Sequence, residues 1–319
     1  MNRYARQMIL PEVGTAGQAR LAQARVLVIG AGGLAAPVLP LLAGAGVGHI
    51  TLVDGDRVSL SNLHRQTLFA EADCGQPKAE VAAQRCRSLN SEITVAAVTQ
   101  ALTPATAPAY VANADLVLDC ADSYAVSYLL SDICRAATVP LLSASVLGLG
   151  GYVGGFCGGA PSLRAVFPDA PDSGASCETA GVLGPVVGMI GAMQAQMALT
   201  VLLELSPSPL GQVVQFDAQG FRASSFRFDG VPEPDGLFAF VAATELCDND
   251  HIIELRADGA ALHPAARRLA GDDIAQHLPP TTDTRLALCC ATGLRAWRAA
   301  EQIRDIWPGE IVLVAASAS

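Results

Sequence analysis

The chain has 319 residues, of which 51% are apolar and 16% are charged, and its formal net charge is −10. Such a composition excludes a disordered chain and is typical of a globular α/β protein with a large core. The negative charge also excludes a general nucleic-acid binder, because no excess of Lys and Arg is available to neutralise phosphates.

Strand-like and helix-like segments alternate along the first two thirds of the chain. Apolar strand-like runs occupy 26–29, 50–53, 93–98, 115–118 and 139–142. Helical spacing of apolar residues occurs between them, at 34–45, 77–89 and 124–137. This alternation predicts a doubly wound, mainly parallel Rossmann-like sheet with helices on both faces.

The pattern changes after residue 139. Gly-rich, antiparallel-looking strands span 145–156, and a loop rich in Pro, Asp and Ser spans 168–176. A long apolar stretch, 182–205, is followed by strands at 212–216 and 222–228. Pro and Gly interrupt the apolar stretch, so we expect a buried helix and no membrane partner.

The string "DGVPEPDG" at 229–236 is typical of an interdomain linker. The residues after it have their own strand and helix pattern. We therefore expect a large α/β domain over 1–228, a linker over 229–243 and a small second α/β domain over 244–319.

Nine cysteines are present without the spacing of a disulfide framework, and no basic-then-apolar leader precedes them. Free thiols in a reducing compartment are the simplest interpretation. We therefore expect a cytoplasmic protein.

A glycine turn follows the first strand, in "VLVIGAGGLAA". Its spacing is Gly30-x-Gly32-x-x-Ala35, in which the glycines allow close approach to a phosphate at a helix N-terminus. Asp54 ends the second strand, where its carboxylate can accept hydrogen bonds from ribose hydroxyls. These features indicate an adenine nucleotide but leave NAD and ATP open.

Two cations follow the second strand, Arg65 and Lys78. Both can neutralise the negative charge that develops on a leaving pyrophosphate. An equal alternative is that both are ordinary charged residues of the protein surface. "DLVLDCADSY" then ends a further strand on Asp119 and Asp122. Asp122 suits Mg²⁺ on ATP phosphates, or else it caps the helix that starts near Ser123.

Six strings in order resemble the ThiF/MoeB/HesA family, the bacterial relatives of ubiquitin-activating enzymes. They cover roughly 1–228 and are "RYARQMILPEVGTAGQ", "ARVLVIGAGGL", "VDGDRVSLSNLHRQ", "GQPKAE", "LVLDCADS" and "SCETAGVLGPVVG". The resemblance implies ATP-dependent adenylation of the C-terminal Gly-Gly carboxylate of a ubiquitin-like sulfur carrier, with Mg²⁺.

The resemblance also assigns roles to residues. Asp54 holds the ribose, Arg65 and Lys78 hold the phosphates, and Asp122 holds Mg²⁺. Arg6 reaches as an arginine finger into the neighbouring subunit of a homodimer. The remaining nucleotide contacts that it implies are Gly30, Gly32, Gly33, Asp56, Asn62 and Gln66.

Three features bear on what this chain retains of the family's chemistry. Cys177, in "ASCETAG", matches the family's loop cysteine, with a chemical role slightly favoured over none. Ser123 and Ser127 replace the usual Asn and Arg. Family members commonly bind zinc through two C-x-x-C pairs. In this chain Ser162 and Ala165 occupy the positions of the first cysteine pair, and the second pair is missing, so we expect no zinc.

The C-terminal string "LALCCATGLRAWRAAEQI" resembles the active loop of rhodanese sulfurtransferases. There Cys290 is the persulfide carrier, and loop N–H groups with Arg295 form an anionic cradle. Cys289 is expected to be a packed core thiol. The domain is short, so an active rhodanese and a degenerate docking module remain equal alternatives.

Three functions are open from the sequence. The first is a homodimeric adenylyltransferase that acts on a sulfur carrier, with sulfur transfer through Cys290. The second is a non-catalytic scaffold that binds a carrier, and the third is an NAD-dependent oxidoreductase. The sequence leaves open which carrier and which pathway are served.

Overall fold

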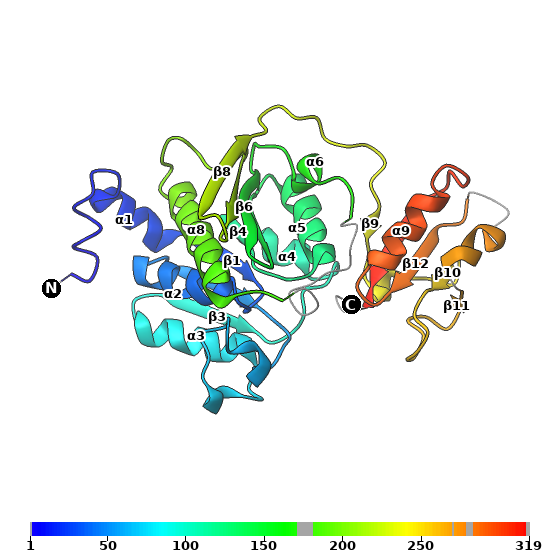
Figure 1. Cartoon of the computed structure of the whole chain (residues 1–319), viewed down its shortest axis with the longest axis horizontal. Helices are drawn as coiled ribbons and strands as arrows, with labels where there is room; N and C mark the ends of the chain where they lie inside the picture. The colour runs from blue at the N-terminus through cyan, green and yellow to red at the C-terminus, as the bar shows by residue number, and fades with distance from the viewer. Residues whose placement is uncertain (1, 171–180, 270, 279–282, 317–319) are drawn as a thin grey trace.

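The computed structural model describes residues 2–170, 181–269, 271–278 and 283–316, which form two α/β units, each with its own sheet (Figure 1). In the described residues the larger sheet has the strand order β3-β2-β1-β4-β5-β6-β7-β8. Its strands are β1 (Arg25–Ile29), β2 (His49–Val53), β3 (Thr94–Val98), β4 (Leu116–Asp119), β5 (Pro140–Leu147), β6 (Gly150–Cys157), β7 (Gln212–Asp217) and β8 (Arg222–Arg227).

The strands from β3 to β5 pair in parallel, and those from β5 to β8 pair antiparallel. In register, Val26 of β1 lies between Ile50 of β2 and Leu116 of β4. All three side chains are buried, as in a sheet covered on both faces. The strand order reverses between β1 and β4, which is where ligands bind in open α/β sheets.

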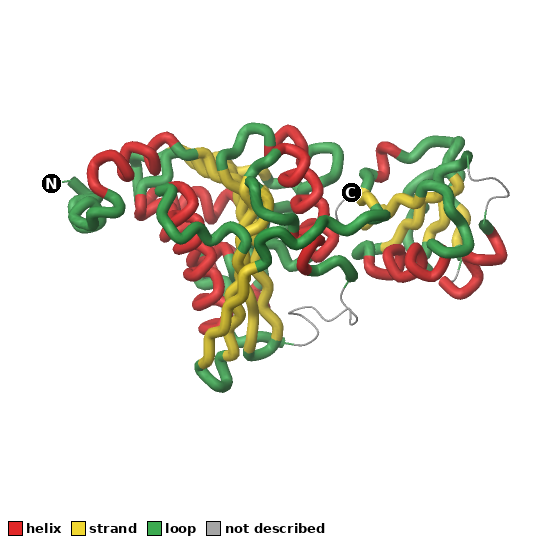
Figure 2. Tube along the Cα trace, turned by 90° about the horizontal axis from the view of Figure 1, so that it is seen from above, coloured by secondary structure: helices red, strands yellow, loops and turns green. Residues whose placement is uncertain are grey.

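Helices cover both faces of this sheet (Figure 2). One face carries α2 (Ala35–Ala45), α3 (Lys78–Leu89) and α8 (Gly184–Leu202); the other carries α4 (Ala107–Val111), α5 (Tyr124–Ala137) and α6 (Leu163–Val166). The predicted fold class is confirmed. A short helix before the sheet, α1 (Gly14–Gln23), was not expected, because only Gly17, Gln18 and Leu21 of it are buried.

The long helix α8 is apolar and long enough to cross a membrane. It packs on α2, β5 and β6, with Val186 and Ile190 buried. Its outer side is open, and Met189 there is 37% exposed. α8 is therefore a helix of the fold that is buried on the side facing α2 and the sheet, while its other side is only partly covered, in part by α1.

The second unit has a sheet of parallel pairs in the order β11-β10-β12-β13-β9. Its described elements are β9 (Ala239–Phe240), β10 (His251–Glu254), β11 (Arg267–Arg268), β12 (Leu286–Cys290), α9 (Leu294–Ile303) and β13 (Ile311–Ala315). The segment expected as a linker, 229–243, thus contains β9, because Phe238 and Phe240 are buried. The described 3₁₀ turns are η1 (Leu60–Asn62), η2 (Glu71–Asp73), η3 (Ala243–Glu245) and η4 (Gly271–His277).

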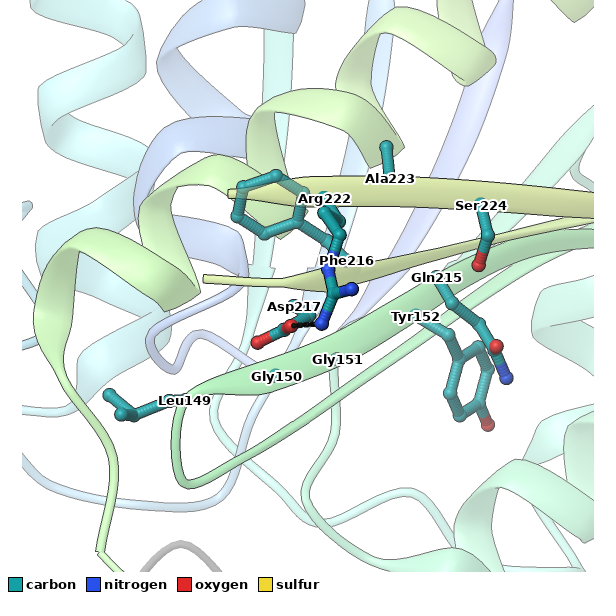
Figure 3. A pocket seen from close by; sticks show the side chains of 10 residues that line it. All are labelled: Leu149, Gly150, Gly151, Tyr152, Gln215, Phe216, Asp217, Arg222, Ala223 and Ser224. Carbon is teal, nitrogen blue, oxygen red and sulfur yellow. Dashed lines mark hydrogen bonds and ion pairs between the residues drawn. The ribbon is translucent and has the colours of Figure 1, made fainter. Parts of the chain in front are cut away.

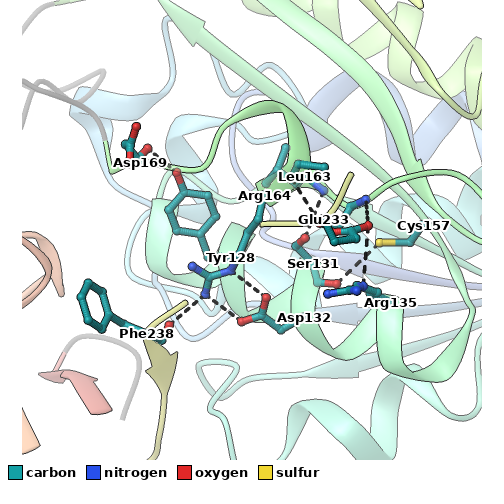
Figure 4. Close-up of polar contacts among 12 residues, drawn as sticks. Tyr128, Ser131, Asp132, Arg135, Cys157, Leu163, Arg164, Asp169, Glu233 and Phe238 are labelled. Carbon is teal, nitrogen blue, oxygen red and sulfur yellow. Dashed lines mark hydrogen bonds and ion pairs between the residues drawn. The ribbon is translucent and has the colours of Figure 1, made fainter. Parts of the chain in front are cut away.

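The two units pack against each other around the guanidinium of Arg164, which is fully buried (Figure 4). Its Nε and Nη2 donate to the two carboxylate oxygens of Asp132 on α5, at 2.6 and 2.7 Å. Nη2 also donates to the carbonyl of Phe238, and the guanidinium lies over the rings of Tyr128 and Trp297. A cation at this position is stabilised by both the carboxylate and the rings.

Candidate nucleotide site and cysteine loop

The glycine turn lies between the ends of β1 and β4. Gly30 has φ +91°, and a Cβ there would lie 2.8 Å from the carbonyl oxygen of Cys120. A Cβ on Gly33 would lie 2.7 Å from Val187 of α8. Only glycine therefore fits either position, and no side chain caps the following helix α2. Among the described residues, the N–H groups of Gly32, Gly33 and Ala35 have no hydrogen-bond acceptor and are open to a phosphate, whereas Ala36 donates to the Gly32 carbonyl.

Asp54 is held directly against this turn. One carboxylate oxygen accepts a hydrogen bond from the N–H of Ala31 at 2.6 Å, and the other accepts from the N–H of Asp56 at 2.7 Å. Burial raises the pKa of Asp54, and both N–H donors oppose that shift. The predicted ribose ligand is therefore placed at the turn, where it also braces the loop that follows β2.

The two predicted cations both contact residues of the loop that follows β2. Lys78 is 4% exposed, and its Nζ is 2.9 Å from Oδ2 of the exposed Asp56. Arg65 donates from Nη2 to Oδ1 of Asn62 at 3.1 Å. A Cβ on Gly33 would lie 3.5 Å from Arg65 Cγ, which puts this arginine beside the turn. Both cations are available to a phosphate that replaces their present partners.

A buried amide with an unused acceptor completes this side of the site. Gln66 is 4% exposed, and its Oε1 has no hydrogen-bond partner in the described part of the chain. Its Nε2 would lie 3.7 Å from a Cβ on Gly32. A buried acceptor without a donor costs free energy unless a ligand or water satisfies it. The residues present therefore fit an extended nucleotide.

Asp122 is exposed and makes no hydrogen bond or ion pair among the described residues. Ser123 is the N-cap residue of α5, so Asp122 is not the helix cap. A Cβ on Gly30 would touch Cys120 and Ala121, which places this loop beside the glycine turn. Its carboxylate is an oxygen donor of the kind that Mg²⁺ takes when it is carried on phosphates.

Two buried residues that the sequence did not single out fix this loop. The Asp119 carboxylate accepts hydrogen bonds from Ser143 Oγ at 2.8 Å and from the Ala121 N–H at 3.2 Å, and burial raises its pKa to about 6. Gln194 of α8 donates from Nε2 to the Asp119 carbonyl at 2.8 Å. A Gln within a mostly apolar helix is the sequence feature that could have revealed the role of Gln194, because a buried amide needs hydrogen-bond partners.

Arg6 is exposed and lies far from the glycine turn of its own chain. Its neighbours Tyr4 and Gln7 contact Gly46 and Ala45, at the C-terminal end of α2. The 11 residues of α2 separate this point from the turn, a length of about 16 Å at 1.5 Å per residue. Cys177 lies outside the described residues.

The two cysteines of β12 face opposite sides of the sheet of the second unit. Cys289 packs with Leu246 and Ile252, and burial raises its pKa to about 12. The other thiol, Cys290, is 1% exposed at the end of β12. Its Sγ accepts hydrogen bonds from the N–H groups of Gly293 and Ala296, at 3.1 and 3.4 Å. The loop therefore directs two N–H donors at one sulfur, as expected of a rhodanese-like cradle.

The segments that would carry the family's zinc ligands are joined by a polar contact. Ser162 donates from Oγ to Glu233 Oε2 at 2.5 Å, and its N–H donates to Oε1 at 2.8 Å. Glu233 belongs to the string "RFDGVPEPDG", where the second cysteine pair would stand. The two segments are thus held together by hydrogen bonds. Among the described residues, no group of three or more His, Cys, Asp and Glu could hold a metal ion.

We expect the purified protein to contain less than a tenth of an equivalent of zinc, because neither Ser162 nor Ala165 offers the thiolate that a structural site needs. Elemental analysis measures this directly. A chelator should also leave the melting temperature unchanged. One equivalent of zinc that is lost together with stability would show that other cysteines have been recruited.

A hollow of about 800 Å³ lies on the antiparallel part of the larger sheet (Figure 3). Tyr152, Gln215 and Ser224 line it from three neighbouring strands, and the Arg222–Asp217 ion pair lies at one end. β6 starts where β5 ends, so this end lies at the same edge of the sheet as the glycine turn. None of the predicted site residues lines it.

Comparison with known proteins places this site in a family context. The ThiF family profile matches residues 4–235. The adenylyltransferase and sulfurtransferase MOCS3 of Sus scrofa is 46% identical over 219 residues, which are 68% of this chain and 48% of that protein. The SAMP-activating enzyme E1 of Haloferax volcanii is 39% identical over 220 residues, 68% of this chain and 82% of that protein.

A solved structure, E. coli MccB with MccA-N7isoASN, has the same fold, with a TM-score of 0.64 at 23% identity. The match covers 73% of this chain and 75% of MccB. The matched part of this chain spans about half the length of the MOCS3 relatives.

Proposed function

Because the chain belongs to the ThiF family, we propose that it adenylates the C-terminal carboxylate of a small ubiquitin-like sulfur carrier that ends in Gly-Gly. The carboxylate attacks the α-phosphorus of ATP, and the bond to the β-phosphate oxygen breaks. Pyrophosphate leaves with the electron pair. The product is an acyl-adenylate, which is activated for attack by sulfur.

The observation that carries this proposal is the pair of cations beside the glycine turn. NAD has no leaving pyrophosphate, whereas the adenylation reaction builds negative charge on one. Lys78 and Arg65 are both positioned to neutralise that charge as it develops. Lys78 is at present paired with Asp56, and Arg65 contacts Asn62 and His64.

The remaining residues bind and orient the substrates. Asp54 faces the turn and takes the ribose, while the free N–H groups of the glycine turn, Gly32 and Gly33, hold a phosphate. Asp122 offers its carboxylate to Mg²⁺, which neutralises phosphate charge when it is bound with ATP. Gln66 Oε1 accepts a hydrogen bond from the nucleotide. The carrier rests on the hollow of β6–β8, with its tail along the sheet edge toward the turn.

The protein acts as a homodimer in this proposal, with Arg6 contributing to its partner's site. The support is the distance of Arg6 from its own glycine turn, together with apolar surface in two places. Ile9 and Leu10 beside Arg6 are 70% and 53% exposed, and Met189 is exposed on α8. An isologous contact would bury such surface on both copies. The free state of the described cysteines supports a cytoplasmic location.

Sulfur transfer follows from the loop of the second unit. The Cys290 thiolate attacks a sulfane sulfur, for example that of thiosulfate, and sulfite leaves with the electron pair. The outer sulfur of the resulting persulfide attacks the acyl-adenylate, and AMP leaves with the electron pair. The acyl disulfide that forms is cleaved by an external thiol, which attacks the Cys290 sulfur and releases the carrier's thiocarboxylate. The support is the pair of N–H groups directed at Cys290, which stabilise an anionic sulfur.

A ligand that binds only the folded protein raises its melting temperature. We expect ATP with Mg²⁺ to raise it by several degrees, and NAD at the same concentration to leave it unchanged. Lys78→Ala should lose most of the ATP effect, because it removes a cation from the site. A shift with NAD and none with ATP would favour an oxidoreductase.

A further inference from the structure

The helix α5 connects the nucleotide site to the second unit. Its first residue, Tyr124, follows two residues after Asp122, a backbone distance of at most about 7 Å. Further along the same helix, Tyr128 and Asp132 contact the Arg164 guanidinium that also touches Trp297 and Phe238. One helix, α5, therefore follows directly on the loop that carries Asp122 and also provides the contact surface for the second unit.

The cysteine loop meets α5 at the end nearest Asp122. A Cβ on Gly293 would lie 2.9 Å from Tyr124 Oη and 2.7 Å from Phe240 Cε1, so the backbone of Gly293 is packed against both rings. On its other side, the N–H of Gly293 donates to Cys290 Sγ at 3.1 Å. Gly293 is thus sandwiched between Tyr124 of the first unit and the sulfur of the second.

An aromatic cluster holds this arrangement in place. The ring of Trp297 lies 5.2 Å from that of Tyr128, 5.5 Å from that of Phe238 and 6.3 Å from that of Phe240. Buried aromatic pairs of this kind stabilise a contact beyond the effect of the area that they bury. The loop is therefore docked against Tyr124 by a contact that involves both units.

We propose that Cys290 delivers sulfur in cis, to the acyl-adenylate formed at the Asp122 site of its own chain, with Tyr124 as the positioning residue between the two sites. This inference rests on the proposed adenylation and sulfur transfer. In the transfer step, the outer sulfur of the Cys290 persulfide bonds to the carrier's carbonyl carbon. The bond from that carbon to the AMP oxygen breaks, AMP leaves with the electron pair, and the carrier stays joined to Cys290 as an acyl disulfide. A thiol reductant supplied in the assay then attacks Sγ of Cys290 and forms a mixed disulfide with it, and the carrier's thiocarboxylate leaves with the electron pair.

Tyr124 has a feature that fits this role. Its Oη is buried and has no hydrogen-bond partner among the described residues, which leaves a donor unused beside the loop. The hydroxyl lies against Gly293 on the side away from Cys290 Sγ, so it is a donor for the outer sulfur of a persulfide at Cys290 and not for Sγ itself.

Heterodimers test the cis assignment. Cys290→Ser and Lys78→Ala chains with different tags are co-expressed and purified through both tags. The Cys290→Ser chain makes acyl-adenylate but has no sulfur, and the other chain has sulfur but makes no adenylate. Delivery in cis predicts that this heterodimer exchanges pyrophosphate. It should form no more thiocarboxylate than the two mutant homodimers do at the same concentration. Thiocarboxylate formation near half the wild-type rate would overturn the proposal.

The oligomeric state does not weaken this test. If both tags never co-purify and the wild-type monomer forms thiocarboxylate, delivery in cis is established. If the wild-type protein exchanges pyrophosphate but forms no thiocarboxylate from a persulfide donor, the cis assignment is overturned while adenylation stands. Loss of exchange in the wild type would overturn the proposed function itself.

Tyr124→Phe tests the positioning residue, with Tyr128→Phe as the matched control. Tyr128 lies on the same helix, and its Oη donates to the carbonyl of Asp169, away from the cysteine loop. Losing a hydrogen bond to a charged sulfur should slow thiocarboxylate formation about tenfold in Tyr124→Phe. Exchange should stay within twofold in both variants. Equal rates of thiocarboxylate formation in the two variants would show that Tyr124 is not a positioning residue for sulfur transfer.

Discussion

Asp122→Ala is expected to lower carrier-dependent ATP–pyrophosphate exchange by on the order of 10²-fold or more, because it removes the carboxylate beside the glycine turn that Mg²⁺ requires. Asp122 is exposed and has no partner among the described residues, so its loss should leave the fold intact. Exchange is measured with labelled pyrophosphate, and the melting temperature of the variant is measured alongside.

Asp115→Ala is the matched control for this substitution. Asp115 is also exposed, but it precedes β4, at the opposite edge of the sheet, where it accepts the N–H of Arg25. Its exchange rate should stay within about twofold of the wild type, since exposed sites away from the chemistry have small effects. Exchange near the wild-type rate in Asp122→Ala would remove this residue from the magnesium site.

The second large effect concerns the dimer. Arg6→Ala and Lys78→Ala chains should each lose on the order of 10²-fold in exchange, because each lacks a cation that meets phosphate charge. When the two are mixed and allowed to exchange subunits, half of the dimers carry one intact site out of two. About a quarter of the wild-type activity should then return.

The mixing experiment needs proof that subunits exchange, which differently tagged chains supply. Mixing two batches of the same variant is the control and should restore nothing. If activity stays absent although heterodimers have formed, Arg6 does not act on the partner's site. Its distance from its own glycine turn would then leave it without a role in adenylation.

Much of the larger unit follows from its sequence, because strands buried on both faces have continuous apolar runs. The runs at 26–29 and 50–53 became β1 and β2, and helical spacing at 124–137 became α5. Glycine spacing also placed the turn, since Gly30 and Gly33 stand where a Cβ would clash. The resemblance to the ThiF family, which the family match confirms, carried most of the functional assignment.

Features that depend on contacts between distant segments could not be predicted. Nothing local marks Arg164 as the residue that joins the two units, since its partners Asp132 and Phe238 lie 32 and 74 positions away. Asp119 and Gln194 stabilise the loop that carries Asp122 through hydrogen bonds that only the folded chain creates. The docking of Gly293 against Tyr124 is likewise a property of the assembled interface.

ATP–pyrophosphate exchange with a ubiquitin-like carrier tests the central claim most directly. The carrier is taken from the gene neighbourhood of this protein and compared with the same carrier lacking its last two glycines. The proposed function predicts exchange that requires ATP, Mg²⁺ and the intact Gly-Gly end, and that is lost in Lys78→Ala. No exchange with the intact carrier, although the two proteins bind each other, would contradict adenylation and leave a carrier-binding scaffold.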